Sequence, residues 1–328
     1  MTLDTDRSLH WLAARSIRRQ VRRLRVQLEG IRAAEDIEYV HQARVASRRL
    51  RTALGVFRAE VGEARARAWR KAIRRTARTL GEARDKDVQI AYVRQMLAST
   101  RDPQQLPGIA RVLVAWEKKR ESLQPRVLRS LEELSASGVL GDILATCKRL
   151  ARAGSARGEA GPVVFDHARR NILDRWETLW ALRPCLADPD DYLQHHQMRI
   201  AAKRLRYTME IYRGAYGGRL DASLDVMKQI QAYLGDLHDC DVWMADLDRL
   251  ARKEARRIEK RFGHAGPMAS LEPGIRLLRE DCAARRRQRF LALGYYWRGL
   301  TEQGFWEELV EAVQGSAWSG PQLLAAGE

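Results

Sequence analysis

The sequence contains two blocks that each occur twice, at nearly the same spacing. The first block, HQARVASRRLR, begins at His41 and recurs as HQMRIAAKRLR from His196, an offset of 155 residues. The second block, LGEARDKDV, begins at Leu80 and recurs as LGDLHDCDV from Leu234, an offset of 154 residues. Two separate blocks at almost one offset indicate a tandem duplication. The chain must therefore fold as two related halves of about 150 residues each.

Hydrophobic periodicity predicts helices in both halves. Between Ser16 and Ile31 the apolar residues recur at intervals of three and four, the pattern of an amphipathic helix. No comparable stretch alternates with the period of two that a half-buried strand requires. We therefore predict an all-α protein in which each half is a bundle of antiparallel helices joined by short loops.

One segment near the middle of the chain has the composition of a linker. Residues 152–162 read RAGSARGEAGP, rich in the Gly and small residues that interrupt helices. This segment separates a first repeat at residues 8–151 from a second at 163–314. We predict that residues 1–314 form a single duplicated domain and that 315–328 form a flexible tail.

Composition excludes several classes of protein. A hydrophobic fraction of 45%, with nine Trp, is too apolar for a disordered basic tail. No apolar run approaches the roughly 18 residues that a membrane-spanning helix needs. The four cysteines are too widely spaced for a zinc knuckle or a disulfide-dense scaffold. Because no basic-then-apolar leader opens the sequence, we expect a cytoplasmic protein.

The net charge points to an anionic partner. The 328-residue chain has 59 Lys and Arg against 42 Asp and Glu, a formal charge of +17. Only nine of these basic residues are Lys, and the other 50 are Arg. The planar guanidinium group of Arg matches phosphate and carboxylate geometry. Charge alone does not identify the polyanion.

The repeated block that begins at His41 or His196 places its basic residues on one face of a helix. At 100° per residue, His41, Arg44, Arg48 and Arg51 share one side, and the apolar residues lie opposite. The second copy does the same with His196, Arg199, Lys203 and Arg206. Neither stripe contains the Glu that usually alternates with Lys or Arg on a solvated face. We therefore predict two uncompensated cationic stripes, each roughly 15 Å long; an ordinary solvated surface is the alternative.

Further basic residues are predicted to point away from the core of their helices. Arg15, Arg19 and Arg22 lie opposite the apolar face of the first helix, and Arg74 and Arg78 do so before the second block. The corresponding part of the second half is less basic. It carries Asp225, Lys228, Gln229 and Ala232, so the basic surface is predicted to be lopsided.

The second repeated block contributes an Asp-x-Asp pair to each half. Asp85, Asp87, Asp239 and Asp241 have the residue type of a magnesium or acid–base site. The alternative, which we favour, is that they pair with the Arg stripes or cap a helix. The sequence has no Walker A loop, nucleophile elbow or His-Glu-x-x-His zinc helix. We expect no metal, no cofactor and no catalytic residue.

These blocks resemble the conserved histidine α-helical domain (CHAD) family. The His-x-x-Arg-x-x-x-Arg/Lys-Arg-Leu-Arg and Leu-Gly-x-x-x-Asp-x-Asp-Val motifs carry the resemblance, and each occurs twice. The resemblance implies two four-helix bundles related by pseudo-twofold symmetry, with a basic cavity or pore between them. It also implies binding of inorganic polyphosphate and, in some members, targeting to polyphosphate granules. The chain resembles the stand-alone type, without a fused triphosphate-hydrolysing CYTH domain.

We therefore predict a non-enzymatic protein that binds inorganic polyphosphate. A general polyanion-binding or nucleic-acid-binding protein is the first alternative, although the stripes offer few aromatic side chains for base stacking. A metal-dependent polyphosphatase is the second. The predicted polyphosphate-binding residues are Arg15, Arg19, Arg22, His41, Arg44, Arg48, Arg49, Arg51, Arg74, Arg78, His196, Arg199, Lys203, Arg204, Arg206 and Lys228.

Overall fold

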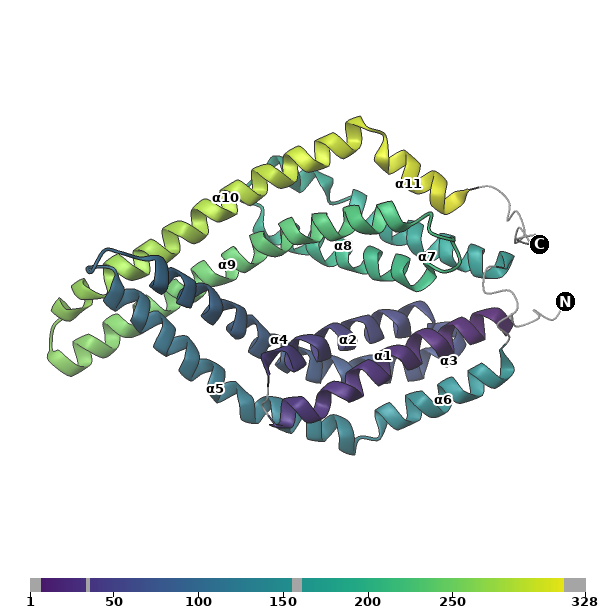
Figure 1. The fold of residues 1–328 in the computed structure, drawn as a ribbon, viewed down its shortest axis with the longest axis horizontal. Helices are drawn as coiled ribbons and strands as arrows, with labels where there is room; N and C mark the ends of the chain where they lie inside the picture. The colour runs from purple at the N-terminus through teal and green to yellow at the C-terminus, as the bar shows by residue number, and fades with distance from the viewer. Residues whose placement is uncertain (1–6, 34–35, 155–160, 316–328) are drawn as a thin grey trace, which may run out of the picture.

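The computed structural model describes residues 7–33, 36–154 and 161–315. Within these ranges every regular element is a helix, as predicted (Figure 1). The first half contains α1 (Arg7–Ala33), α2 (Ile37–Val56), α3 (Arg58–Val61), α4 (Glu63–Ser99), α5 (Leu106–Ala136) and α6 (Val139–Ala153). The second half contains α7 (Pro162–Trp180), α8 (Tyr192–Tyr212), α9 (Asp221–Phe262), α10 (Glu272–Glu302) and α11 (Phe305–Gln314), with short 3-10 helices η1 (Arg183–Ala187) and η2 (Gly266–Ser270).

The helices end close to the predicted breaks. The predicted linker separates α6, which ends at Ala153, from α7, which begins at Pro162. Proline at the first helical position of α7 loses no hydrogen bond there and presets the helical φ angle. The predicted tail lies outside the described residues, apart from Gly315.

The apolar faces predicted for the repeated blocks form the core. Leu50 and Phe57 in the first half are fully buried, and so are Leu205 and Tyr212 in the second. They belong to one continuous cluster of buried side chains with contributions from both halves. Burying these faces leaves the basic side of α2 and of α8 outside that core.

A second, smaller core lies in an arm that both halves build. Helices α4 and α9 have 37 and 42 residues, and they extend beyond the main body with α5 and α10 (Figure 1, left). Tyr92, Trp116, Trp243 and Cys282 are buried there, one from each of these four helices. The arm therefore ties the halves together, and the second repeated block of each half reaches into its core, where Cys240 is buried. No helix in the described ranges is long and apolar enough to cross a membrane.

Candidate functional site

Two helices carry the repeated basic blocks, and the fold brings them together. The carboxylates of Asp36 and Asp191 accept hydrogen bonds from the backbone N–H groups of Glu38 and Gln194. These caps satisfy donors that a helix end leaves free, so α2 and α8 begin just before the blocks. The two helices contact each other along the basic sides that their cores leave outside. Stripes that are 155 residues apart in the sequence thus share one space.

That space is a pocket of about 480 Å³ between α2 and α8, with α4 and α7 closing one end. Nine of its fifteen lining residues are cationic, and none is acidic. The cationic residues are Arg44, Arg48, Arg51, Arg70, Arg74, Arg175, Arg199, Lys203 and Arg204. We call it the central pocket. Five of the nine belong to the predicted stripes of α2 and α8. Arg204 and Arg74 were predicted as binding residues outside the stripes, whereas Arg70 and Arg175 were not predicted.

Crowding of like charges perturbs the groups in the central pocket. Burial, together with Arg44, Arg199 and Arg206, lowers the pKa of Arg48 to about 10. The pKa of Arg51 is lowered by burial and by Arg74, Arg70 and Arg204. Lys203 is affected most, because burial and the neighbouring guanidinium groups lower its pKa to about 6. Each of these shifts disfavours the charged form, so the pocket is electrostatically strained without an anion.

Several hydrogen-bond donors at the pocket also lack partners. The Nε atoms of Arg48, Arg51, Arg70 and Arg199 are buried and make no hydrogen bond within the described part of the chain. A buried donor left unsatisfied costs about 1–3 kcal/mol. Oxyanions of a ligand would supply both the missing acceptors and the missing negative charge.

Tyr207 is the only aromatic residue among those that line the central pocket, and guanidinium groups already cover it. The Cζ atoms of Arg48, Arg49 and Arg206 lie 5.0, 5.6 and 4.9 Å from the ring centroid. These are cation–π distances. The ring is 2% exposed, so it holds arginines in place and offers no face to a nucleobase.

The motif histidines lie at the ends of the stripes. His196 Nδ1 is 3.2 Å from Nδ1 of His238, and the two rings are 4.5 Å apart. Burial, Arg199 and His196 lower the pKa of His238 to about 3. Burial first, and nearby arginines second, lower the pKa of His41 and of His196. Desolvation is therefore a larger cause of these lowered pKa values than the cationic surroundings.

The Asp-x-Asp pairs bind arginine in the same way in both halves. Asp85 lies 3.5 Å from Arg44, and Asp239 lies 4.0 Å from Arg199, so the first Asp of each pair holds the first Arg of each stripe. The second Asp of each pair binds an Arg of the arm: Asp87–Arg120 is 2.7 Å and Asp241–Arg286 is 2.5 Å. The favoured pairing with the Arg stripes is confirmed for Asp85 and Asp239. Asp87 and Asp241 also form ion pairs, but with arginines outside the stripes. The described residues contain no cluster of three potential metal ligands.

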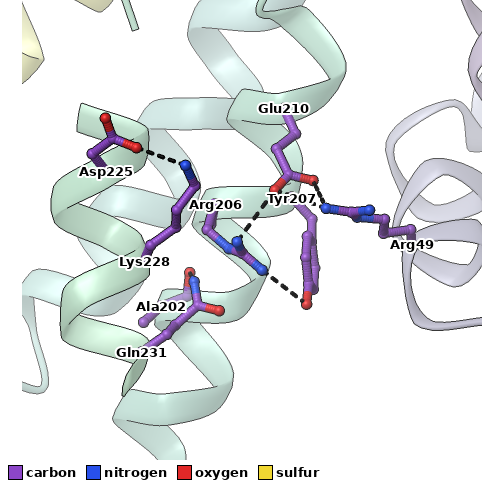
Figure 2. Close-up of polar contacts among 8 residues, drawn as sticks. All are labelled: Arg49, Ala202, Arg206, Tyr207, Glu210, Asp225, Lys228 and Gln231. Atoms are coloured by element: carbon purple, nitrogen blue, oxygen red, sulfur yellow. Dashed lines mark hydrogen bonds and ion pairs between the residues drawn. The ribbon is translucent and has the colours of Figure 1, made fainter. Parts of the chain in front are cut away.

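The other predicted residues lie around the central pocket or away from it. Arg15, Arg19 and Arg22 line a separate pocket of about 470 Å³ between α1 and α6. Arg78 is exposed and pairs with Glu82 at 3.5 Å, and Lys228 is exposed and pairs with Asp225 at 2.6 Å (Figure 2). Arg49 and Arg206 both pair with Glu210, a contact that sequence reasoning did not find.

Arg70 could have been predicted and Arg175 could not. Arg70 lies four residues before Arg74 on α4, so the two share a helix face. Arg175 lies on α7, outside both repeated blocks, and nothing in its local sequence marks it. The pocket between α1 and α6 has five arginines and no carboxylate among its lining residues, whereas another cavity is more balanced in charge. The pocket between α4, α5 and α9, about 620 Å³, balances its cations with ion pairs such as Lys86–Asp246 at 2.6 Å.

The fold is all-helical, and two copies of one basic helix face a shared pocket. These features define the class of protein as a duplicated helical domain with a basic pocket. Comparison with known families agrees: the sequence model of the CHAD domain matches residues 15–248. The chain therefore belongs to the CHAD family. No curated protein matches it.

Two solved structures resemble the fold. The CHAD domain from the plant Ricinus communis superposes with a TM-score of 0.62 at 23% identity, covering 92% of this chain and 94% of that one. PptA from Streptomyces chartreusis gives a TM-score of 0.58 at 16% identity, covering 88% of this chain and 98% of that one. At these identities the likeness concerns the fold alone.

Proposed function

We propose that this protein binds inorganic polyphosphate in the central pocket and does not act on it as an enzyme. The observation that carries the proposal is the set of nine cationic side chains without a carboxylate among the lining residues. Polyphosphate is a flexible chain of phosphoryl groups without bases. A ligand of that kind requires only closely spaced donors with positive charge, and arginine forks supply both.

The proposed architecture is two four-helix bundles related by pseudo-twofold symmetry, with the basic cavity between them. Matching ion pairs support it, because Arg44–Asp85 in the first half has its counterpart in Arg199–Asp239 in the second. Each pair joins the α2 or α8 stripe to the long helix of its own half. The ligand would then contact both halves at once, which multiplies the contacts available to one chain.

Nucleic acid remains the competing partner, and the pocket favours polyphosphate over it. Bases bound by single-strand-binding proteins stack on exposed aromatic rings. Tyr207, which arginines cover, supplies no such ring. A general polyanion surface would also bind duplex DNA, whose phosphates lie on the outside of a rigid helix.

A polyphosphatase would need carboxylates free to hold magnesium and to activate water. Asp87 and Asp241 instead face Arg120 and Arg286. We therefore propose a binding role, in a cytoplasmic protein that associates with polyphosphate granules. Release of phosphate that depends on magnesium, and that Asp87→Asn removes in a folded protein, would contradict it.

A competition titration tests the choice of ligand. Labelled long-chain polyphosphate is bound to the purified protein near physiological salt and challenged with duplex DNA or with heparin at equal charge concentration. We expect polyphosphate to win by at least about a hundredfold, because flexible phosphates can enter the central pocket and a rigid duplex cannot. Equal competition by DNA or heparin would make the protein a general polyanion binder.

A paired substitution tests the site. Arg51→Gln with Arg204→Gln removes two cations of the central pocket, for which we expect at least about a tenfold loss of polyphosphate affinity. Arg101→Gln with Arg252→Gln is the control, since both residues are exposed on arm helices or loops and remove the same charge. Circular dichroism checks that each variant folds. Equal losses in the two double variants would show that net charge, and no particular pocket, controls binding.

A further inference from the structure

One difference between the two copies places a carboxylate beside the α2–α8 contact. At the offset of 155 residues that relates the first repeated blocks, Glu210 on α8 corresponds to Gly55 on α2. Gly55 lines the central pocket, and a Cβ atom added there would lie 3.5 Å from Cζ of Arg70. A guanidinium group therefore fills the space next to Gly55. Glu210 instead lines a neighbouring pocket, where its carboxylate lies among arginines.

Glu210 is bound on two sides by arginines of the predicted site. Its carboxylate lies 2.9 and 3.1 Å from Nη2 of Arg49 on α2, and 3.5 Å from Nη1 of Arg206 on α8 (Figure 2). The Glu210 side chain is only 23% exposed. Arg206 also donates to the hydroxyl of Tyr207 at 3.3 Å. These contacts resemble the way two guanidinium groups would hold one phosphoryl group.

The surroundings of Glu210 continue the basic surface beyond the central pocket. Glu210 lines a neighbouring pocket of about 510 Å³ together with Arg15, Arg19 and Arg213. Arg213 is held by Asp221 at 2.7 Å, so this second pocket contains two carboxylates against three arginines. The central pocket has nine cations and no carboxylate. A polyanion thus meets strong attraction in the central pocket and a nearly balanced charge in the neighbouring one.

We propose that Glu210 is an internal substitute for a phosphoryl group, and that it limits bound polyphosphate to the central pocket. The inference rests on the proposed function. In the native protein the carboxylate is paired with Arg49 and Arg206, so a chain that fills the central pocket does not bind them. Glu210 then sets how many phosphoryl groups one protein engages and makes the two pockets of a duplicated site unequal.

The test compares short and long ligands on Glu210→Gln. Glutamine keeps the size of the side chain, removes its charge and frees two arginines. Long-chain polyphosphate should bind about tenfold more tightly, with two further phosphate contacts. The slope of log K against log salt should steepen by about 1.4, the value expected for two contacts on a single-stranded polyanion. Tripolyphosphate, which the central pocket accommodates alone, should change by less than twofold.

A further substitution and a control complete the design. Arg49→Gln added to Glu210→Gln should return long-chain affinity to about the native value. Glu117→Gln, which removes a carboxylate paired with Arg94 in the arm at 2.6 Å, should leave both ligands unaffected. Thermal melting verifies the fold of each variant.

The outcomes separate the two proposals. If the native protein binds neither ligand, the proposed function fails. If it binds polyphosphate and Glu210→Gln binds long chains no better, or less well, the role of Glu210 fails while the proposed function stands.

Discussion

Each arginine of this protein is best described by the partner of its guanidinium group. Arg120 and Arg286 are paired with the buried carboxylate of Asp87 and the half-buried carboxylate of Asp241, and removing either cation would leave an uncompensated charge. Arg48 and Arg51 have no carboxylate within ion-pair distance in the described structure, and their Nε donors are unsatisfied. The first kind stabilises the fold. The second kind raises the free energy of the ligand-free protein and is available to an anion.

Lys203 makes polyphosphate binding depend on pH. It faces Arg199 on its own helix, Arg44 and Arg48 from α2, and Asp239 from α9, and its pKa of about 6 leaves it neutral at pH 7. Phosphoryl oxygens beside it favour the ammonium form and raise the pKa, so binding takes up a proton. We expect affinity to rise as the pH falls from 8 towards 6, and to level off below 6, where Lys203 is charged even without ligand.

Calorimetry in buffers of different ionisation enthalpy measures this proton uptake directly. The control is Lys203→Arg, which keeps a cation that stays charged over the whole range and should remove the uptake between pH 6 and 8. His238, whose pKa burial and Arg199 lower to about 3, would take up protons only at more acidic pH. Identical proton uptake by the native protein and Lys203→Arg would contradict the role of Lys203.

At the scale of helices, the sequence predicted which helix faces are buried. It did not predict the arm, in which long helices of both halves pack together. The periodicity around Leu50 and Leu205 identified the buried sides, because burial of an apolar stripe decides how a helix rotates. The arm was not predicted, because it forms where the α4–α5 pair of the first half packs against the α9–α10 pair of the second. One signal for it exists. Pro-Gly-Ile occurs at 107–109 and again at 273–275, where α5 and α10 begin, but its offset of 166 residues differs from that of the other blocks.

The glycines of this repeated Pro-Gly-Ile segment let α5 and α10 touch. A Cβ atom on Gly274 would lie 2.1 Å from the carbonyl oxygen of Gln105 and 2.8 Å from Cα of Gly108, both backbone atoms. Gly274→Ala must therefore shift one helix, and we expect it to lower the free energy of unfolding by about 1–3 kcal/mol. Gly294→Ala, further along α10 with nothing within 4 Å of the added atom, should be stabilising by up to about 1 kcal/mol. Denaturant unfolding compares the two. If both variants are equally stable, α5 and α10 can move apart without lowering the free energy of unfolding.

At the scale of the whole molecule, the candidate site exists only because the two halves meet. The sequence predicted each cationic stripe from helical geometry and the lack of acidic residues. It could not predict that α2 and α8 face each other, because no local pattern encodes the packing of segments 155 residues apart. For the same reason Glu210 passed unnoticed: its neighbour Arg206 belonged to a recognised stripe, but Arg49 reaches it only in the folded protein.

Bringing two cationic stripes together destabilises the ligand-free protein, and Arg48→Met measures by how much. Arg48 contacts the ring of Tyr207 but has no carboxylate partner, and burial first, with Arg44, Arg199 and Arg206 after it, lowers its pKa to about 10. Methionine fills a similar volume without the charge. We expect the free protein to become more stable by about 1 kcal/mol, which raises its melting temperature by a few degrees. Polyphosphate affinity and the ligand-induced rise in melting temperature should both decrease.

Arg120→Met is the matched control for this substitution. Its guanidinium group is paired with Asp87, which is 4% exposed at the side chain, so the same change should destabilise the free protein by about 3–5 kcal/mol. Opposite signs for the two variants in thermal melting without ligand are therefore expected. If Arg48→Met also lowers the melting temperature, the cations of the central pocket hold the halves together and their strain is not released by a bound anion. If it raises the melting temperature and leaves affinity unchanged, the strain is real but the ligand binds elsewhere. The proposed pocket therefore predicts that Arg48→Met is more stable without ligand and binds polyphosphate more weakly. Both results are needed to show that the repelling cations of the pocket serve to bind a polyanion.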